Sequence, residues 1–308
     1  MCVRAGATVV AGELPPTAGQ LVREGDDSCF VPRFAFVEGT TYTVLVEGVA
    51  VAVLVHPRHE RAATTEVLDI WPTAAEVPRN LLRLYVRFSD RMSEGYAAGH
   101  VRLVDDAGEV MVGALLPTEH ELWDSDRCRL TVLLDPARIK RGLVAHRRNG
   151  YPLKVGVSFR VVIDEGFRDA GGIELRTGAE RRFEVGGDER RRVDPDDWTL
   201  TVPSSDTPEP LDVVFDRSLD RGLLTRCLHV IGPDGRRVEG TAAIGAEERS
   251  WRLTPDIAWA RGSHQLVVDP VLEDLAGNSV GRVFDRDLTS PLDEPRQARP
   301  VVVTFCPG

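Results

Sequence analysis

The chain has 308 residues, of which 42% are hydrophobic and 28% are charged. This composition is too apolar for a disordered chain, and the length is sufficient for two or three packed domains. The formal net charge of −10 makes the protein a poor electrostatic partner for phosphate backbones and anionic membranes, so we expect no nucleic-acid partner.

Cysteine usage and hydropathy exclude further classes of protein. The five cysteines are odd in number and widely spaced, and they form no Cys-x-x-Cys or Cys/His ligand pattern. This distribution favours neither a structural zinc site nor a disulfide framework, and we expect no cofactor. No segment approaches the roughly 18 apolar residues of a transmembrane helix. The first residues also lack the basic and apolar regions of a signal peptide.

Short apolar segments of alternating character dominate the chain. Examples are residues 41–46, 82–88 and 155–163, which are rich in Val, Leu and Phe and are separated by clusters of Gly, Pro and Asp. Alternation with a period of two indicates strands with one buried face. Only residues 135–144 approach the pattern of an amphipathic helix, so the sequence predicts a nearly all-β protein.

An internal repeat organises these strands. Phe88-Ser89-Asp90-Arg91-Met92 matches Phe215-Asp216-Arg217-Ser218-Leu219 at an offset of 127, and the same offset pairs Gly108 with Gly235. Each copy predicts a strand ending in Phe, a turn, a large apolar side chain that closes the end of a sandwich, and a hairpin at the glycine. Two copies imply two domains.

The second half of the repeat fixes the expected domain boundaries. Two insertions in the first copy reduce the offset to 106, which pairs Ala170-Gly171 with Ala276-Gly277. A third, partial copy precedes both. The sequence therefore predicts a partial N-terminal domain, a first sandwich with two inserted loops, a linker, and a second sandwich whose C-terminal strand returns to its sheet; the four segments are 1–64, 65–187, 188–197 and 198–308.

The order of these motifs resembles the bacterial Ig-like domains of surface-layer and other cell-envelope proteins. The pattern of that family runs from a strand ending in Phe-Ser-x-x-Met, through a glycine hairpin, to a closing Asp-x-Ala-Gly-Asn turn. The best matches are Phe88 to Met92 and Asp274-Leu275-Ala276-Gly277-Asn278. The likeness covers residues 66–187 and 194–288, and more weakly 21–46, and the first copy lacks the final Asn.

This resemblance implies tandem Ig-like β-sandwiches, two complete copies and an N-terminal partial copy, that act as spacers, adhesive modules or decoration. It supplies no catalytic residues. The partner that it implies is a protein or polysaccharide of the cell envelope, and the location that it implies is extracytoplasmic. Because such a location normally requires a signal peptide, we hypothesise that the true start lies upstream of Met1.

The closing turn offers one possible metal site. Asp274, Asn278 and backbone carbonyls could ligate calcium, which takes oxygen ligands. The turn itself also explains these residues, because Gly277 and Asn278 tolerate a positive φ better than other residues. The turn interpretation is favoured, and we predict no metal.

The first inserted loop carries the side chains with the most chemistry, namely Glu119, His120, Trp123, Asp124 and Asp126. Paired acids near a histidine can bind a metal or share a proton, and an exposed Trp can stack on a sugar. An ordinary hairpin tip at 124–126, with the Trp folded onto the sandwich, accounts for the same residues and is favoured.

The second inserted loop is basic, with Arg138, Lys140, Arg141, Arg147 and Arg148. It could bind an anion, an acidic polysaccharide or the acidic face of a neighbouring domain, or it could be a solvated charge run. The two loops flank a strand at 129–134, which at about 3.3 Å per residue separates them by roughly 20 Å. We therefore expect them at opposite poles of the sandwich and not in one active site.

The remaining polar residues suggest no catalysis. Motifs for a nucleophilic serine or a phosphate loop are missing from the sequence, and His264 is expected to be a packed residue at the edge of the core. Arg190-Arg191-Arg192 lies among acids and is interpreted as part of a linker. The sequence thus predicts a non-catalytic structural or binding module. The alternative is a metal-dependent carbohydrate- or ligand-binding protein, or an enzyme, that uses the first inserted loop.

Overall fold

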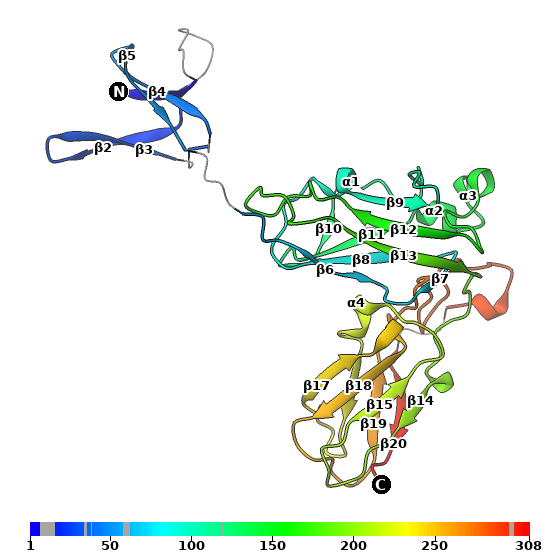
Figure 1. Ribbon diagram of the computed structural model, residues 1–308. Coiled ribbons are helices and arrows are strands. Elements are labelled where there is room, and N and C mark those ends of the chain that lie inside the picture. The colour runs from blue at the N-terminus through cyan, green and yellow to red at the C-terminus, as the bar shows by residue number, and fades with distance from the viewer. Residues whose placement is uncertain (7–15, 34–35, 38, 58–61, 119, 296–298) are drawn as a thin grey trace. The chain divides into compact units, whose positions relative to one another are not determined.

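The computed structural model describes the whole chain except residues 7–15, 34–35, 38, 58–61, 119 and 296–298. The chain forms two compact units, Met1–Ala62 and Ala63–Gly308 (Figure 1). In the described residues the α-helices span only four to six residues each. The prediction of a nearly all-β fold built from tandem sandwiches is therefore confirmed.

The N-terminal unit contains one small sheet and one hairpin. The sheet has the order β1-β4-β5, and the hairpin joins β2 to β3. The strands are β1 (Cys2–Ala5), β2 (Gly19–Glu24), β3 (Asp27–Pro32), β4 (Thr41–Val46) and β5 (Val49–Val55). Among the residues described in this unit, the buried apolar side chains are Val3, Tyr42 and Leu45, a far smaller set than in either complete sandwich.

The first sandwich has two four-stranded sheets, with the orders β10-β11-β8-β6 and β7-β13-β12-β9. Its strands are β6 (Val67–Trp71), β7 (Glu76–Pro78), β8 (Arg83–Phe88), β9 (Val101–Asp105), β10 (Leu122–Trp123), β11 (Arg129–Leu133), β12 (Ser158–Ile163) and β13 (Ala179–Gly186). Three short helices decorate it: α1 (Ala97–His100), α2 (Pro136–Ile139) and α3 (Val144–Asn149). Alternate residues of β11 and β12 point into a core that contains Phe88, Phe159, Phe167 and Phe183.

The second sandwich pairs a four-stranded sheet, β14-β15-β18-β17, with a three-stranded sheet, β16-β19-β20. Its elements are β14 (Thr199–Thr201), β15 (Leu211–Val214), α4 (Arg221–Leu224), β16 (Leu228–Ile231), β17 (Gly240–Ile244), β18 (Ser250–Pro255), β19 (His264–Val268) and β20 (Val301–Phe305). Trp198, Trp251 and Trp259 belong to a core distinct from that of the first sandwich. Two facing pairs of sheets therefore enclose two separate cores, as the duplicated sequence predicts.

The repeated motifs occupy equivalent places in the two sandwiches. Met92 and Leu219 are both completely buried, which confirms that the large apolar residue after each turn closes the core. Gly108 and Gly235 both have a positive φ, of 85° and 76°, in the hairpins that follow. A residue with a side chain would be strained in these positions, so the glycine is a requirement of the turn.

The closing turns align differently from the sequence prediction. Asp169 and Asp274 make the same hydrogen bonds, because one carboxylate oxygen accepts from the amides two and four residues later. Gly172 (φ 77°) is therefore the counterpart of Gly277 (φ 80°). The pairing of Ala170-Gly171 with Ala276-Gly277 was wrong by one residue.

His264 lies at the start of β19 and is buried. Its ring stacks on Phe305, with 5.5 Å between centroids, and contacts Trp259 edge-on. Its Nδ1 lies 3.1 Å from the carbonyl of Gly262. The prediction of a packed histidine with a satisfied ring nitrogen is confirmed.

Candidate functional site

The first inserted loop lines a groove of about 1200 Å³ on the first sandwich. Its lining combines residues of 94–101, which include α1, with residues of 113–118 and 120–125 and with Leu130 to Leu133 of β11. Leu115, Leu116, Leu122 and Val132 make much of the lining apolar. The groove is a tertiary feature, because its walls come from segments on either side of β9.

Trp123 lines this groove and is folded onto the sandwich. Its ring lies 5.8 Å from that of Phe88 and 6.0 Å from that of Phe167. Its indole Nε1 donates to Glu121 Oε2 at 2.7 Å, and Glu121 Oε1 accepts from the backbone amide of Ala97 at 2.6 Å. Glu121, which the sequence did not single out, thus joins the inserted loop to α1.

At the tip of the loop, Asp124 stabilises the hairpin through hydrogen bonds to its backbone. Asp124 Oδ1 accepts from the amides of Cys128 and Arg129 at 2.9 and 3.1 Å. His120 and Asp126 are exposed. Glu119 lies outside the described residues. Within those residues, no three His, Cys, Asp or Glu side chains gather in a group that could hold a metal ion.

We predict that Glu121→Ala loosens the wall of the groove. The change leaves the Ala97 amide and the Trp123 indole without their acceptor, at a cost of about 1–3 kcal/mol. Hydrogen exchange at the Ala97 amide should accelerate. Glu94→Ala is the control, because the Glu94 carboxylate is exposed and forms only a 3.5 Å ion pair with Arg127. Equal protection of Ala97 in both variants would contradict the role given to Glu121.

Three basic side chains of the second inserted loop, Arg138, Lys140 and Arg141, make contacts within the protein. Arg138 donates to the carbonyls of Gly113, Asn149, Gly150 and Tyr151. Lys140 lies 4.5 Å from the centre of the Phe284 ring, and Arg141 pairs with Asp285 at 3.1 Å. Arg147 and Arg148 are exposed on α3. The helices α2 and α3 lie at the end of β11 away from β10 (Figure 1), and no residue from 135–150 lines the groove.

The closing turn of the second copy is built from its own side chains. Asp274 Oδ1 accepts from the amides of Ala276 and Asn278, and Asn278 Nδ2 donates to Asp274 Oδ2 at 3.0 Å. Asn278 does not have a positive φ, so that part of the prediction was wrong. The Asn side chain is instead a connector, because it also donates to the Glu189 carbonyl and accepts from the Phe284 amide, both at 3.0 Å.

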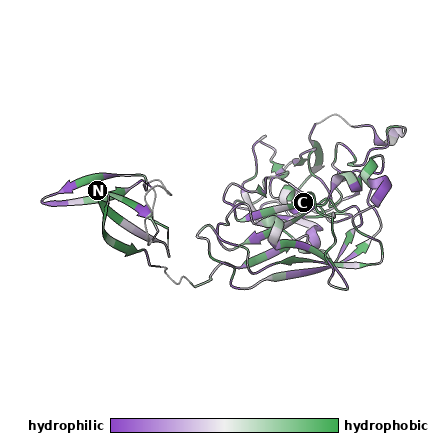
Figure 2. Ribbon diagram, turned by 90° about the horizontal axis from the view of Figure 1, so that it is seen from above, coloured by the Kyte–Doolittle hydropathy of each residue, from purple (hydrophilic) through white to green (hydrophobic). Residues whose placement is uncertain are grey.

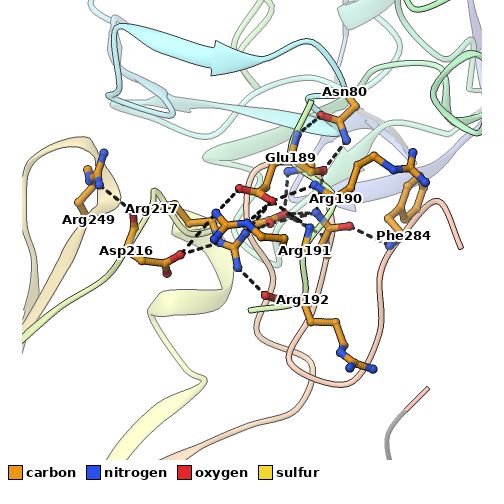
Figure 3. Close-up of polar contacts among 12 residues, drawn as sticks. Asn80, Glu189, Arg190, Arg191, Arg192, Asp216, Arg217, Arg249 and Phe284 are labelled. Carbon is orange, nitrogen blue, oxygen red and sulfur yellow. Dashed lines mark hydrogen bonds and ion pairs between the residues drawn. The ribbon is translucent and has the colours of Figure 1, made fainter. Parts of the chain in front are cut away.

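The connector belongs to a buried joint between the two sandwiches (Figure 3). Asn80, from the first sandwich, exchanges two hydrogen bonds with the backbone of Glu189. The Glu189 carboxylate pairs with Arg217 of the second sandwich at 2.9 Å, and Arg217 in turn lies 3.8 Å from Asp274. Arg217 is only 9% exposed. The segment interpreted as a linker is thus packed at Glu189 and Arg190, since Arg190 also pairs with Asp285 at 2.6 Å.

The pKa values of two carboxylates in this joint are shifted in opposite directions. Burial raises the pKa of Asp274 to about 7, against the lowering effects of Asn278 and Arg217. Burial also acts to raise the pKa of Glu189, but hydrogen bonds and ion pairs with Arg191 and Arg217 outweigh it and lower that pKa to about 2. The joint therefore contains one carboxylate, Glu189, that stays ionised in mildly acidic solution, and one, Asp274, that takes up a proton near neutral pH.

Two further polar contacts cross between the sandwiches. From β8, Tyr85 donates to Asp220 at 2.8 Å, and Arg83 pairs with both Asp220 and Glu273. Thr73 donates from its amide to Glu248 at 2.7 Å and from its hydroxyl at 2.9 Å. Glu248 is fully buried, and burial raises its pKa. Asp220, Glu248 and Glu273 of the second sandwich thus each meet a hydrogen-bond donor of the first.

The joint also has an apolar part. Leu275 and Phe284, from the second sandwich, pack against the core of the first, and the Leu82 amide donates to the Leu275 carbonyl at 2.9 Å. Gly277 lies against Leu82 and Phe284, because a Cβ at this position would come within 2.4 Å of Leu82 Cδ2 and 3.3 Å of the Phe284 ring. The glycine therefore permits the close approach of the sandwiches as well as the turn.

We predict that Gly277→Ala destabilises the protein by about 2–4 kcal/mol, the sum of a strained positive φ and overpacking of the joint. Gly235→Ala is a matched control, because its φ is also positive, at 76°, but nothing lies within 4 Å of its Cβ position. It should cost only about 1 kcal/mol. Urea denaturation measures both, and equal losses would show that the joint is not tightly packed at Gly277.

Comparisons with known proteins yield low similarities. No family model matches the chain, and no curated protein matches it. A solved structure of Escherichia coli alpha-2-macroglobulin, spanning domains MG0-NIE-MG1, shares 10% identity, with a TM-score of 0.25 over 67% of this chain and 66% of the other. The S-layer protein rSbsC(31-844) shares 15% identity, with a TM-score of 0.28 over 66% of this chain and 23% of the other.

The FN1-FN3 domains of chicken CNTN1 share 13% identity, with a TM-score of 0.20 over 99% of this chain and 91% of the other. The chain spans less than two thirds of the length of the first two structures. Because all these TM-scores are low, the fold class rests on the strand pairing of the chain itself. In its described part, no helix is long and apolar enough to cross a membrane.

Proposed function

We propose that residues 63–308 act as one non-catalytic structural segment, in which a joint fixes the orientation of two Ig-like sandwiches. The observation that carries this proposal is the burial of the polar groups that connect them. Arg217, Asp274 and Glu248 are each less than 10% exposed and meet partners across the joint or beside it. Buried polar groups accept few geometries, because a displaced partner leaves an unsatisfied charge.

A flexible spacer would have a different interface. Domains joined by an exposed linker with few crossing contacts reorient freely. Here the linker itself supplies Glu189 and Arg190 to the joint, and three separate polar contacts plus an apolar contact cross it. This arrangement suits a segment that transmits force or holds a spacing.

We also propose the domain boundaries and the cellular location of the protein. We take 65–187 and 198–308 as the sandwiches, 188–197 as their connection and 1–64 as a partial Ig-like domain. The order of the repeated motifs supports membership of the bacterial Ig-like family, an extracytoplasmic location, and a protein or polysaccharide of the envelope as partner. Fractionation of the cells that produce the protein tests this location, and recovery in the cytoplasmic fraction alone would contradict it.

Cooperative unfolding tests the structural role. Amide resonances of Val161 and Leu266, one in each core, should disappear at the same urea concentration if the joint couples the sandwiches. Midpoints separated by more than the width of one transition would show two independent domains. That result would remove the structural proposal without affecting the location.

The groove favours a second candidate function, binding of a small ligand or carbohydrate at the first inserted loop. Its volume of about 1200 Å³ and its mixed lining, with Trp123, Arg91 and Arg127 among apolar side chains, fit such a ligand. A glycan-array screen tests it with Ala98→Trp, which fills the groove, and with Ala243→Trp on an exposed strand as control. Binding that survives Ala98→Trp would place the site elsewhere, and repeating the screen with a chelator tests the metal-dependent alternative.

A further inference from the structure

The edge strand of the N-terminal unit, β5, is apolar along its whole length. Its sequence is Val-Ala-Val-Ala-Val-Leu-Val, and all seven residues are exposed. Val49, Val51, Val53, Leu54 and Val55 are each between 53% and 66% exposed. Figure 2 colours the residues by hydropathy, and green, hydrophobic strands are present in the unit that carries the N label.

The outer edge of β5 lacks a partner among the described residues. The strand is the last in the order β1-β4-β5, and a tight turn at Glu47 and Gly48, both with a positive φ, holds it against β4. Its outward N–H and C=O groups can therefore accept another strand. Natural edge strands are usually protected by a charge, a proline or a covering segment. Between Gly48 and Val55 the sequence has no charge and no proline.

The sequence of β5 indicates which strand fits. Under a two-fold axis at Ala52, an antiparallel copy places Val49 opposite Val55, Ala50 opposite Leu54, and Val51 opposite Val53. Each pair is apolar, the small Ala50 meets the large Leu54, and the two Ala52 residues meet at the axis. A self-complementary strand of this kind forms an isologous contact, the commonest interface between identical chains.

We propose that β5 is a homotypic interface, at which a second copy of this chain adds its own β5 and extends the sheet to β1-β4-β5-β5-β4-β1. The contact buries apolar side chains and satisfies the open backbone edge at the same time. The ladder with β4 skips Val51, so β5 carries a bulge at that residue. This interface does not depend on the joint between the sandwiches, so its test is independent of the proposed function.

Sedimentation of the full chain tests the interface. We expect a dimer, and Val53→Lys should weaken it by about 100-fold, because it brings two like charges close to the two-fold axis. The far-UV spectrum of this variant should match that of the parent, because Val53 is exposed. Val112→Lys introduces the same charge at an 88% exposed valine of the first sandwich and should leave the dimer unchanged.

Cross-linking tests the register. Opposed residues in an antiparallel pair have Cα atoms about 4.5–5.5 Å apart, which suits a disulfide. Ala52→Cys should therefore give an oxidant-dependent covalent dimer in excess of the parent, whereas Val112→Cys should not. A parent chain that is monomeric at about 100 μM, far above a micromolar Kd, would overturn the proposal. A dimer unaffected by Val53→Lys would overturn it equally.

Discussion

Replacing Arg217 by Ala should destabilise the protein by about 3–5 kcal/mol, the range for removing one partner of a buried ion pair. The loss is large because Asp274, which is 2% exposed, and the partly buried Glu189 lose the guanidinium that lies 3.8 and 2.9 Å from them, respectively. Guanidinium chloride denaturation measures the effect. Because the joint connects both sandwiches, the unfolding transition should also broaden or split into two.

An exposed ion pair provides the control for this variant. Arg252 forms two hydrogen bonds with Asp212 on the surface of the second sandwich, at 2.6 and 2.9 Å. Its geometry is as good as that of the Arg217 contacts, but solvent screens it, so Arg252→Ala should cost far less stability than Arg217→Ala. Similar losses for the two variants would mean that the Arg217 cluster is not a buried joint.

Raising the pH from 5 to 8 should destabilise the parent protein relative to Asp274→Asn. Because burial raises the pKa of Asp274 to about 7 from an ordinary value of 3.8, the folded protein holds a proton in this range that the unfolded chain has released. That contribution to stability is complete below about pH 4 and is lost as the pH rises through 7, with a slope of at most about 1.4 kcal/mol per pH unit. Asn keeps the shape of the turn but cannot ionise.

Glu189 should give the opposite pH dependence of stability in the same denaturation measurements. Its pKa is lowered to about 2 from 4.5, so it contributes stability above pH 4.5 that is lost as the pH falls toward 2. Glu189→Gln should flatten this acid limb and leave the limb between pH 5 and 8 unchanged. If the stability of the parent relative to Asp274→Asn stays constant or increases as the pH rises from 5 to 8, the burial of an ionisable Asp274 is contradicted.

The sequence predicted the class of fold because the signals for it are local. Alternating apolar residues mark strands, and Gly108 and Gly235 mark hairpins that only a positive φ allows. The repeat then placed Met92 and Leu219 in equivalent cores. The closing turns were misaligned by one residue, because an Ala-Gly pair follows the Asp directly in the first copy but only after Leu275 in the second.

The joint could not be predicted, because its residues are distant in the chain. Thr73 and Glu248 are 175 positions apart, and neither has neighbours that distinguish it from a surface residue. The sequence did not predict the groove. The hairpin and the folded Trp123 follow from turn chemistry, but the wall that Glu121 makes with Ala97 depends on how the loop meets α1. Asn278 was assigned to a backbone role, whereas its side chain is what connects the turn to Glu189.

The central claim is that the two sandwiches keep one orientation. Residual dipolar couplings of backbone amides test it most directly, because they report the orientation of every N–H bond in a single frame. Couplings from 65–187 and from 198–308 of the full chain should fit one alignment tensor of the same magnitude and direction. Two tensors of different magnitude would show that the sandwiches move independently, and the joint would then not hold them.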